Sequence, residues 1–574
     1  MVRTAIGMAV LAFALLASAF LAAVALGAGA PTGAGAAPGT AAATDDAPPG
    51  LTPTNGPPAN GSRVRIAAVL PNPVATGDRG EYLVLSTPGA TNLSGWSVAD
   101  GDGVARLPNR IVTGQVVLTT DPDAVSADGP VLELRGRVAL ANGGERIELR
   151  RKGRTVDLLS YDRAPEGELY VRDSGGTWQP VGATDRPVVR VEGARVRSFV
   201  LPDSPGVPLD HLRNATDRIL LGGYTITSGR VVRALCAARE RGVHVRALFE
   251  GGPVGGITER GADRLDRLAR CGVPVSVIGG ERARYTFHHP KYAVVDDAAL
   301  VLTENWGPAG VGGRSNRGWG TLVRDPGVAR ALAETFRADA GFRDAVPWER
   351  YRSNATVVAS DPVPTERYPE RFEPKVAPAD RVSVLLAPDN AESAIVSGID
   401  AAEESIRVEQ ISIGSRDHPF VRALLRAARR GVTVRVLLGS ASYVRADNRE
   451  IAAWLNERAD QEGLPLEARL AAPRSRFGKI HAKGLVIDDT VVLGSINWTN
   501  GSIRANREVA LAIEDRAIAR FYKRVFRADW RGGVWSLPVG LFALAALSIG
   551  GTALIGSRIR FDPDYSVSPA ASER

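Results

Sequence analysis

Two short segments of the chain carry the same set of chemically active side chains. Each holds a histidine, a lysine two residues later, an aspartate five residues after the lysine and an asparagine nine residues after the aspartate. These residues are His289, Lys291, Asp296 and Asn305 in the first segment, and His481, Lys483, Asp488 and Asn497 in the second. Side chains at positions i and i+2 of a strand point to the same face, so each histidine is expected beside its lysine. The apolar runs 292–295 and 484–487 predict that both strands are buried.

Two histidine–lysine sets that face each other suit phosphodiester transfer. One imidazole can attack phosphorus and form a phosphohistidine, while the other protonates the departing alkoxide and then deprotonates the incoming water or alcohol. The two lysines and two asparagines would hold the non-bridging oxygens. This chemistry requires no metal and no cofactor, and with six histidines and two cysteines in the whole chain a histidine-rich or thiolate metal site is not expected.

Both segments belong to a longer internal repeat. Residues 420–437 match residues 231–248 nearly position for position, and each copy ends with Phe-Arg-Ala-Asp, at 336–339 and 526–529. The pattern of buried strand, amphipathic helix and buried strand over 219–249 returns from 406 onward. The offset between the copies stays within three residues, which indicates a duplicated α/β unit.

The motifs resemble those of the phospholipase D superfamily, whose halves each carry His-x-Lys-x4-Asp with a downstream Gly-Ser and Asn. The resemblance covers roughly residues 197–530. It implies two α/β/α halves packed about a pseudo-twofold axis, with the active site between them in a monomeric catalytic unit. The second half fits well: Ser495 and Asn497 follow Gly494, and Glu508 stands where the family places an acidic residue that orients a histidine.

The first half departs from this pattern. Leu302-Thr303 stands where Gly-Ser is expected, and Gly318 occupies the position equivalent to Glu508. Thr303 can still donate a hydrogen bond, but a histidine without an orienting acceptor can take the wrong tautomer. Asp296 is a candidate to replace the missing carboxylate. On this interpretation His481 is the better supported histidine, although the family pattern favours the first, His289, as nucleophile; His288, on the opposite face, is expected to be structural or at the rim.

Other parts of the chain differ in composition and in the pattern of apolar residues, and the following domain organisation is expected. Residues 1–27 are typical of a signal peptide or N-terminal anchor, and 28–62 of a flexible linker. Residues 63–162, with short apolar runs between turns, predict a β-sandwich; Leu-Ser-Gly-Trp at 93–96 and Gly-Gly-Glu at 143–145 resemble the lamin-tail domain, which implies an immunoglobulin-like fold with Trp96 in its core. A connector, phospholipase D-like half 1 (196–341), a second connector (342–381) and half 2 (382–530) follow.

The C-terminal region predicts a membrane anchor. Residues 534–556 form an uncharged stretch of transmembrane length. Arg558 and Arg560 favour a cytoplasmic tail at 557–574 and catalytic halves outside the cell membrane. In such an oxidising compartment Cys236 and Cys271 could pair; two buried free thiols are the alternative.

Three functions are compatible with these features. The formal charge of +8 and pI near 9.6 suit a phospholipid surface or nucleic acid. The first hypothesis is a membrane-anchored, extracytoplasmic phosphodiesterase that hydrolyses or transesterifies phospholipids, as phospholipase D and cardiolipin synthases do. The second is a surface-anchored extracellular nuclease of the same superfamily. The third is a non-catalytic module that binds phosphate.

Overall fold

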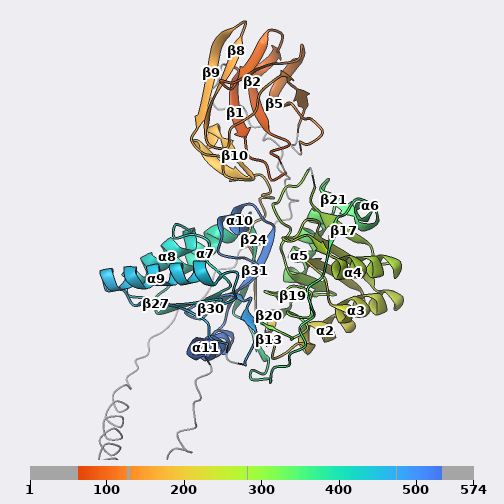
Figure 1. Ribbon diagram of the computed structural model, residues 1–574, viewed down its shortest axis with the longest axis vertical. Coiled ribbons are helices and arrows are strands. Elements are labelled where there is room, and N and C mark those ends of the chain that lie inside the picture. Colours follow the sequence, from red (N-terminus) through yellow and green to blue (C-terminus); the bar gives the residue numbers. More distant parts are fainter. Residues whose placement is uncertain (1–62, 76, 126–128, 281, 474, 533–574) are drawn as a thin grey trace, which may run out of the picture. The chain divides into compact units, whose positions relative to one another are not determined.

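The computed structural model describes residues 63–75, 77–125, 129–280, 282–473 and 475–532 (Figure 1). The predicted signal segment 1–27, linker 28–62, transmembrane stretch 534–556 and tail 557–574 lie outside the described residues. Within the described ranges, no helix combines the length and the apolar character needed to cross a membrane.

The N-terminal part is built from two β-sheets around one hydrophobic core. The six-stranded sheet has the order β11-β10-β1-β2-β5-β6 and the five-stranded sheet the order β7-β4-β3-β8-β9. Leu83 of one sheet and Trp96 and Ile147 of the other are buried in the shared core, as expected for Trp96. The strands are β1 (Arg65–Leu70), β2 (Tyr82–Asn92), β3 (Trp96–Ala99), β4 (Val104–Arg106), β5 (Ile111–Thr119), β6 (Val131–Glu133), β7 (Arg135–Gly136), β8 (Glu145–Arg151), β9 (Arg154–Tyr161), β10 (Glu168–Val171) and β11 (Thr177–Pro180), with the short helix η1 (Arg172–Ser174).

The sandwich extends beyond its predicted end at residue 162. β10 pairs with β1, and β11 pairs with β10, although both strands lie in the polar segment expected to be a connector. Aromatic contacts hold them, since Trp178 packs edge-on against Tyr161 and Tyr170 with ring centroids 5.8 and 5.2 Å apart. The likeness to lamin-tail domains stays a prediction from the sequence.

The first half of the repeat is a ten-stranded mixed sheet with helices on both sides. Its order is β21-β17-β15-β14-β18-β19-β20-β13-β23, with β28 against β20. Its elements are β13 (Arg195–Leu201), α2 (Gly206–Arg213), β14 (Arg218–Gly223), α3 (Gly229–Glu240), β15 (His244–Glu250), α4 (Glu259–Arg270), β17 (Val275–Ile278), β18 (Tyr292–Val295), β19 (Ala298–Leu302), β20 (Asn316–Arg324), α5 (Pro326–Ala340), β21 (Ala345–Pro347) and α6 (Trp348–Arg352). The short strands β16 (Ile257–Thr258) and β22 (Val357–Val358) pair with each other.

The second half repeats this plan in an eight-stranded sheet. Its order is β12-β24-β31-β30-β29-β25-β26-β27. Its elements are β24 (Arg381–Ala387), α7 (Ala391–Asp400), β25 (Ser405–Gln410), α8 (Pro419–Arg429), β26 (Thr433–Leu438), α9 (Arg445–Glu462), β27 (Leu466–Leu470), β28 (Lys479–Ile480), β29 (Lys483–Ile487), β30 (Thr490–Gly494), α10 (Asn500–Arg504), β31 (Glu508–Glu514) and α11 (Arg516–Arg531). The predicted duplication is confirmed and extends to the helix caps. Asp325 precedes α5 and accepts hydrogen bonds from two N–H groups of its first turn, and Asp515 precedes α11 and accepts one, from the Ile518 N–H.

The two halves exchange edge strands. β12 (Val189–Glu192), which precedes the first half, pairs with β24 of the second. β23 (Lys375–Pro378), which precedes the second half, pairs with β13 of the first. The segments expected to be plain connectors therefore tie each half to its neighbour.

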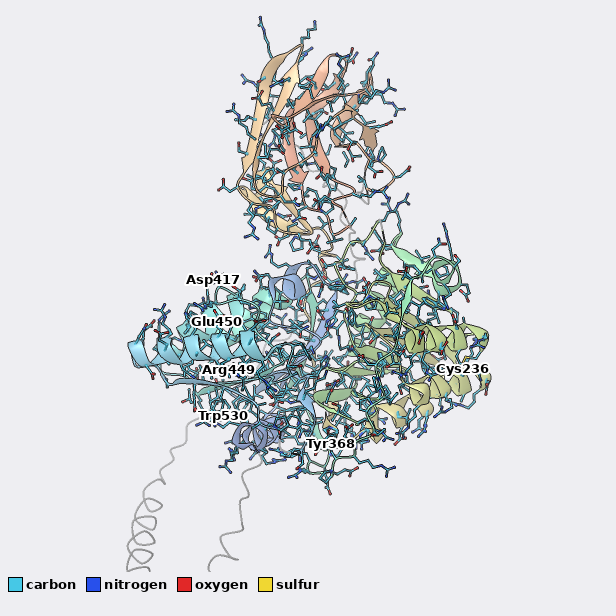
Figure 2. All side chains as sticks on the ribbon, viewed as in Figure 1. Cys236, Tyr368, Asp417, Arg449, Glu450 and Trp530 are labelled. Atoms are coloured by element: carbon cyan, nitrogen blue, oxygen red, sulfur yellow. A yellow bond between two sulfur atoms is a disulfide. The ribbon has the colours of Figure 1, made fainter. Side chains whose placement is uncertain are left out.

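A common core joins the halves. It contains residues of both sheets and of α5 and α11, and Trp319 stacks on Tyr522 with centroids 4.5 Å apart. Helices α3 and α4 (Figure 1) belong to a separate outer core. There Cys236, labelled in Figure 2, forms a disulfide with Cys271. Of the two alternatives that the sequence left open, a disulfide or two buried free thiols, the structure has the disulfide.

Buried ion pairs also cross the common core. Arg317 of the first half contacts Asp529 on α11 at 2.8 Å, and Arg507 of the second half contacts Asp339 on α5 at 3.1 Å. Asp339 and Asp529 are the last residues of the repeated Phe-Arg-Ala-Asp signature. The last residue of each signature therefore helps to neutralise a buried arginine of the other half, whose charge would otherwise carry a large desolvation cost.

Candidate active site

Backbone contacts across the halves bring the two histidines to one interface. The His289 N–H donates to the Arg507 carbonyl at 2.9 Å, and the His481 N–H donates to the Arg317 carbonyl at 3.0 Å. β28, directly before His481, runs parallel to β20, and the residue before His289 bridges to Arg507 in the same sense. Each histidine is thus held by a strand of the opposite half.

Both lysines lie beside their histidines, as the i, i+2 spacing predicts. The Lys291 Nζ donates to the His289 carbonyl at 2.7 Å, and the Lys483 Nζ donates to the His481 carbonyl at 3.0 Å. Both side chains are buried. Burial lowers the pKa of Lys291 well below its ordinary value, and burial lowers the pKa of Lys483 to about 8. Burial thus disfavours the charged form of both amines, while the carboxylates of Glu508 and Glu304 act to retain it.

Glu508 orients His289, the histidine of the other half. Its two carboxylate oxygens lie 2.9 Å from the His289 Nδ1. Ser502 Oγ and Asn506 Nδ2 donate to the same carboxylate at 2.6 and 3.1 Å. Burial acts to raise the pKa of Glu508, but His289 and Lys291 outweigh it and leave that pKa below its ordinary value. The expectation that Glu508 favours His481 is therefore wrong, because the contact crosses the interface.

The carboxylate that was expected to be missing is supplied by Glu304. Its Oε2 lies 3.3 Å from the His481 Nδ1, and Asn316 Nδ2 donates to it at 2.9 Å. Asn316 is the equivalent of Asn506, so the amide that supports the acid is kept on both sides. The Thr303 carbonyl accepts from the same imidazole nitrogen at 3.1 Å. Asp296 does not take this role.

Gly318 makes room for Glu304. A Cβ atom at Gly318 would lie 2.3 Å from the Glu304 Cγ, so the two positions cannot both carry a long side chain. In the second half the order is reversed, with Glu508 at the glycine position and Ile496 at the position of Glu304. This reciprocal exchange was visible in the sequence, and it is the signal by which Glu304 could have been found.

Both imidazoles are neutral at neutral pH. Burial lowers the pKa of His289 to about 4 and lowers the pKa of His481. The His289 Nδ1–H is donated to Glu508 and the His481 Nδ1–H to the Thr303 carbonyl, with Glu304 at 3.3 Å, so in each ring Nε2 carries the lone pair that attacks or accepts a proton. The Lys483 Nζ lies 3.5 Å from the His481 Nε2. The edge of Tyr224 packs against His289 with ring centroids 4.6 Å apart, which restricts the ring further.

The asparagines and hydroxyls separate into two groups. The Oδ1 atoms of Asn305 and Asn497 are buried and accept no hydrogen bond from the part of the chain that the structure describes. Thr303 Oγ1 accepts from the Trp319 N–H at 2.9 Å, and Ser495 Oγ accepts from the Val509 N–H at 3.0 Å. Thr303 and Ser495 therefore lock neighbouring strands, whereas the side-chain oxygens of Asn305 and Asn497 take no part in such bonds.

Asp296 and Asp488 are placed away from the histidines. Asp296 accepts from the N–H groups of 216–218 at 2.8–3.3 Å, and Asp488 accepts from those of 403–405 at 2.7–3.0 Å. Each carboxylate closes the turn after its strand, where its own backbone has positive φ. Seven residues of extended chain separate it from its histidine, roughly 20 Å. This placement differs from the prediction that counted both aspartates among the catalytic residues.

His288 has the structural place expected of it. Its side chain is fully buried, its N–H donates to Glu250 at 2.6 Å, and burial lowers its pKa to about 4.

Comparison with known proteins agrees with this geometry. A family model described as "Cardiolipin synthase, PLD-like domain" matches residues 209–340 and 395–530. The chain is 31% identical over 163 residues to a mitochondrial cardiolipin hydrolase of Xenopus laevis, which covers 28% of this chain and 70% of that protein. It is 31% identical over 129 residues to a phospholipase D of Rickettsia felis, covering 22% of this chain and 58% of that protein.

A phosphatidylserine synthase from Haemophilus influenzae is among the similar solved structures, with a TM-score of 0.43 and 13% identity over 64% of this chain and 94% of that one.

The two segments that the family model matches coincide with the two halves that supply His289 and His481, and the cardiolipin hydrolase is matched over most of its length. The chain therefore belongs to the phospholipase D superfamily.

Proposed function

We propose that the protein is a phosphodiesterase of the phospholipase D type that acts on phospholipids, by hydrolysis or by transfer of the phosphatidyl group. The observation that carries the proposal is the pair of crossed contacts, Glu508 with His289 and Glu304 with His481, beside two buried lysines. Two oriented imidazoles with adjacent cations are what an in-line displacement at phosphorus needs from a protein.

His289 is the proposed nucleophile. Its carboxylate contact is the shorter of the two, 2.9 Å against 3.3 Å, and both oxygens of Glu508 face its Nδ1, so its ring is the more firmly oriented for attack. The Nε2 lone pair forms a bond to phosphorus, and the bond from phosphorus to the leaving alkoxide breaks with its electrons. Protonated His481 gives its proton to that oxygen. The negative charge of the bound diester, next to Glu304, raises the pKa of His481 enough to hold this proton.

The second displacement reverses the proton flow. Neutral His481 removes a proton from water or an alcohol, whose oxygen then bonds to phosphorus while the bond to His289 breaks. Lys291 and Lys483 balance the charge on the non-bridging oxygens in both displacements, and the amide donors of Asn305 and Asn497 contact the same atoms. Water as acceptor gives hydrolysis, and a lipid alcohol gives transfer.

The proposed place of action is outside the cell membrane, with the stretch 534–556 as anchor. The Cys236–Cys271 disulfide supports this, since such bonds persist in oxidising compartments. The N-terminal sandwich is proposed to bind or position the enzyme at its surface. Fractionation of cells expressing the full chain would test this: recovery in the soluble fraction would exclude the anchor.

One assay tests the reaction class. The purified protein is offered headgroup-labelled phospholipid vesicles or plasmid DNA, with EDTA present. Headgroup release, lost in His289→Ala and His481→Ala, is expected; DNA cleavage without headgroup release would identify a nuclease. Binding of either without turnover would indicate a non-catalytic module.

A second assay tests the nucleophile. With a phosphatidyl ester of 4-nitrophenol, whose leaving group needs no acid, His481→Ala should accumulate acid-labile phosphohistidine and His289→Ala should not. The opposite pattern would assign the attack to His481.

A further inference from the structure

A cavity of about 150 Å³ lies beside the proposed nucleophile and has no part in the chemistry described so far. Its lining is largely apolar and includes Phe249, Val254, Ile257 and Leu265, with Thr225 half-buried at one side. The one carboxylate in the lining, Glu250, accepts from the N–H groups of Gly252 and His288, both at 2.6 Å. A cavity of this size and character is large enough for a benzene-sized hydrocarbon group.

Tyr224 connects the cavity to the reacting atoms. Its ring forms part of the cavity wall and also packs edge-on against His289, with centroids 4.6 Å apart. The Lys291 Nζ lies 5.4 Å from the same ring. The Tyr224 side chain is therefore the group that lies in contact with both His289 and the cavity.

The rim of the cavity presents an apolar side chain to solvent. Val254 is 78% exposed at the tip of the Gly-Gly-Pro-Val-Gly-Gly loop (251–256), and its N–H donates to the Tyr224 hydroxyl at 2.6 Å. The second half has Tyr443 at the equivalent position, 189 residues later, and it is 58% exposed. The Lys479 Nζ, two residues before His481, lies 5.1 Å from the Tyr443 ring. Both halves thus expose an apolar side chain next to the segment that carries the histidine.

We propose that this cavity is a subsite for the hydrocarbon part of a phospholipid, and that Val254 and Tyr443 contact the lipid surface around it. The proposal rests on the phosphodiesterase function proposed above and adds to it the part of the substrate that is recognised. A nucleobase is a poorer occupant, because most of this lining is apolar and its few polar side chains would replace only part of the hydrogen bonds that the polar edge of a base makes to water. A hydrocarbon chain loses none, and an exposed tyrosine beside a lysine suits the boundary between headgroups and acyl chains.

Two substitutions test the subsite without touching the catalytic groups. Thr225→Phe fills the cavity and Val254→Asp places a charge at its rim; Ile111→Asp, at a 72% exposed position of the N-terminal sandwich, is the matched control. We expect kcat/KM for dioctanoylphosphatidylcholine to fall at least tenfold in both test variants. For glycerophosphocholine, which has no acyl chains, kcat/KM should stay within twofold of the wild type. Ile111→Asp should match the wild type on both substrates.

Direct binding separates this proposal from the proposed function. Calorimetry with dihexanoylphosphatidic acid over a range of temperatures should give a negative heat-capacity change with the wild type, the mark of buried apolar surface, and a smaller one with Thr225→Phe. If the wild type turns over neither substrate, the phosphodiesterase function fails and this binding result alone decides the subsite. The subsite proposal would be overturned if Thr225→Phe kept both the lipid kinetics and the heat-capacity change of the wild type. Absence of lipid binding to the wild type would also overturn it. So would an effect of the variants that is confined to a dinucleotide substrate.

Discussion

Replacing Glu304 by glutamine should disable His481 while leaving the fold in place. The change keeps the shape of a side chain that is 1% exposed and removes only the charge that faces the imidazole. A charge-assisted hydrogen bond contributes roughly 1.5–3 kcal/mol, which corresponds to a fall in kcat of about 10- to 150-fold. The 3.3 Å contact places the expected value toward the lower end of that range.

The assay for Glu304→Gln is headgroup release across a pH series, with Glu450→Gln, an exposed acid of α9, as control. Glu304 acts to raise the pKa of Lys483, so its loss should move the alkaline limb of kcat/KM to lower pH. The double variant Glu304→Ile/Gly318→Glu copies the second half's arrangement into the first and should recover much of the activity. Wild-type kcat and an unmoved alkaline limb in Glu304→Gln would refute the assignment.

Three further outcomes are expected. In the wild type, kcat/KM should fall as pH rises through about 8, because Lys483 is charged below its pKa and loses its proton above it; a flat profile between pH 7 and 9.5 would contradict this. Asp296→Ala leaves three N–H groups without their acceptor and should lower the free energy of unfolding by about 1–2 kcal/mol in urea titration. Its kcat should stay within twofold of the wild type, whereas a catalytic aspartate would lose activity without losing stability. Reduction of the Cys236–Cys271 bond, which closes a loop with a sequence separation of 35, should destabilise the fold by about 3–4 kcal/mol. The Cys236→Ser/Cys271→Ser double variant should melt at the same temperature with and without reductant.

The histidines, lysines and asparagines were predictable because their spacing repeats with the fold. A strand fixes the side chains at i and i+2 on one face, so local sequence was enough to place Lys291 and Lys483. Glu304 was not predicted because each half was compared with its own histidine. The acid that matters to His481 is contributed by the opposite half, and no periodicity in either half reports a contact between them.

The roles of the aspartates and connectors depended on long-range structure in the same way. Asp296 keeps a regular distance from His289 because it closes the turn of the same hairpin. A constant spacing between histidine and aspartate can therefore reflect the geometry of the hairpin and does not by itself indicate a catalytic role. β12 and β23 are short, partly exposed strands, and their pairing partners lie roughly 180–195 residues away along the chain, so their alternation was too weak to identify them.

The crossed contacts between carboxylate and histidine have a consequence for how the two copies could diverge after duplication. The carboxylate of each half contacts the histidine of the other half. A substitution that moves the carboxylate to another position within one half therefore affects the histidine of the opposite half. A homodimer of the first half would pair His289 with Glu304, and one of the second would pair His481 with Glu508. Two separate polypeptides, one per half, would restore the present pairs only as a heterodimer. The two halves therefore depend on each other, because each histidine keeps its present carboxylate only when the other half is part of the same assembly.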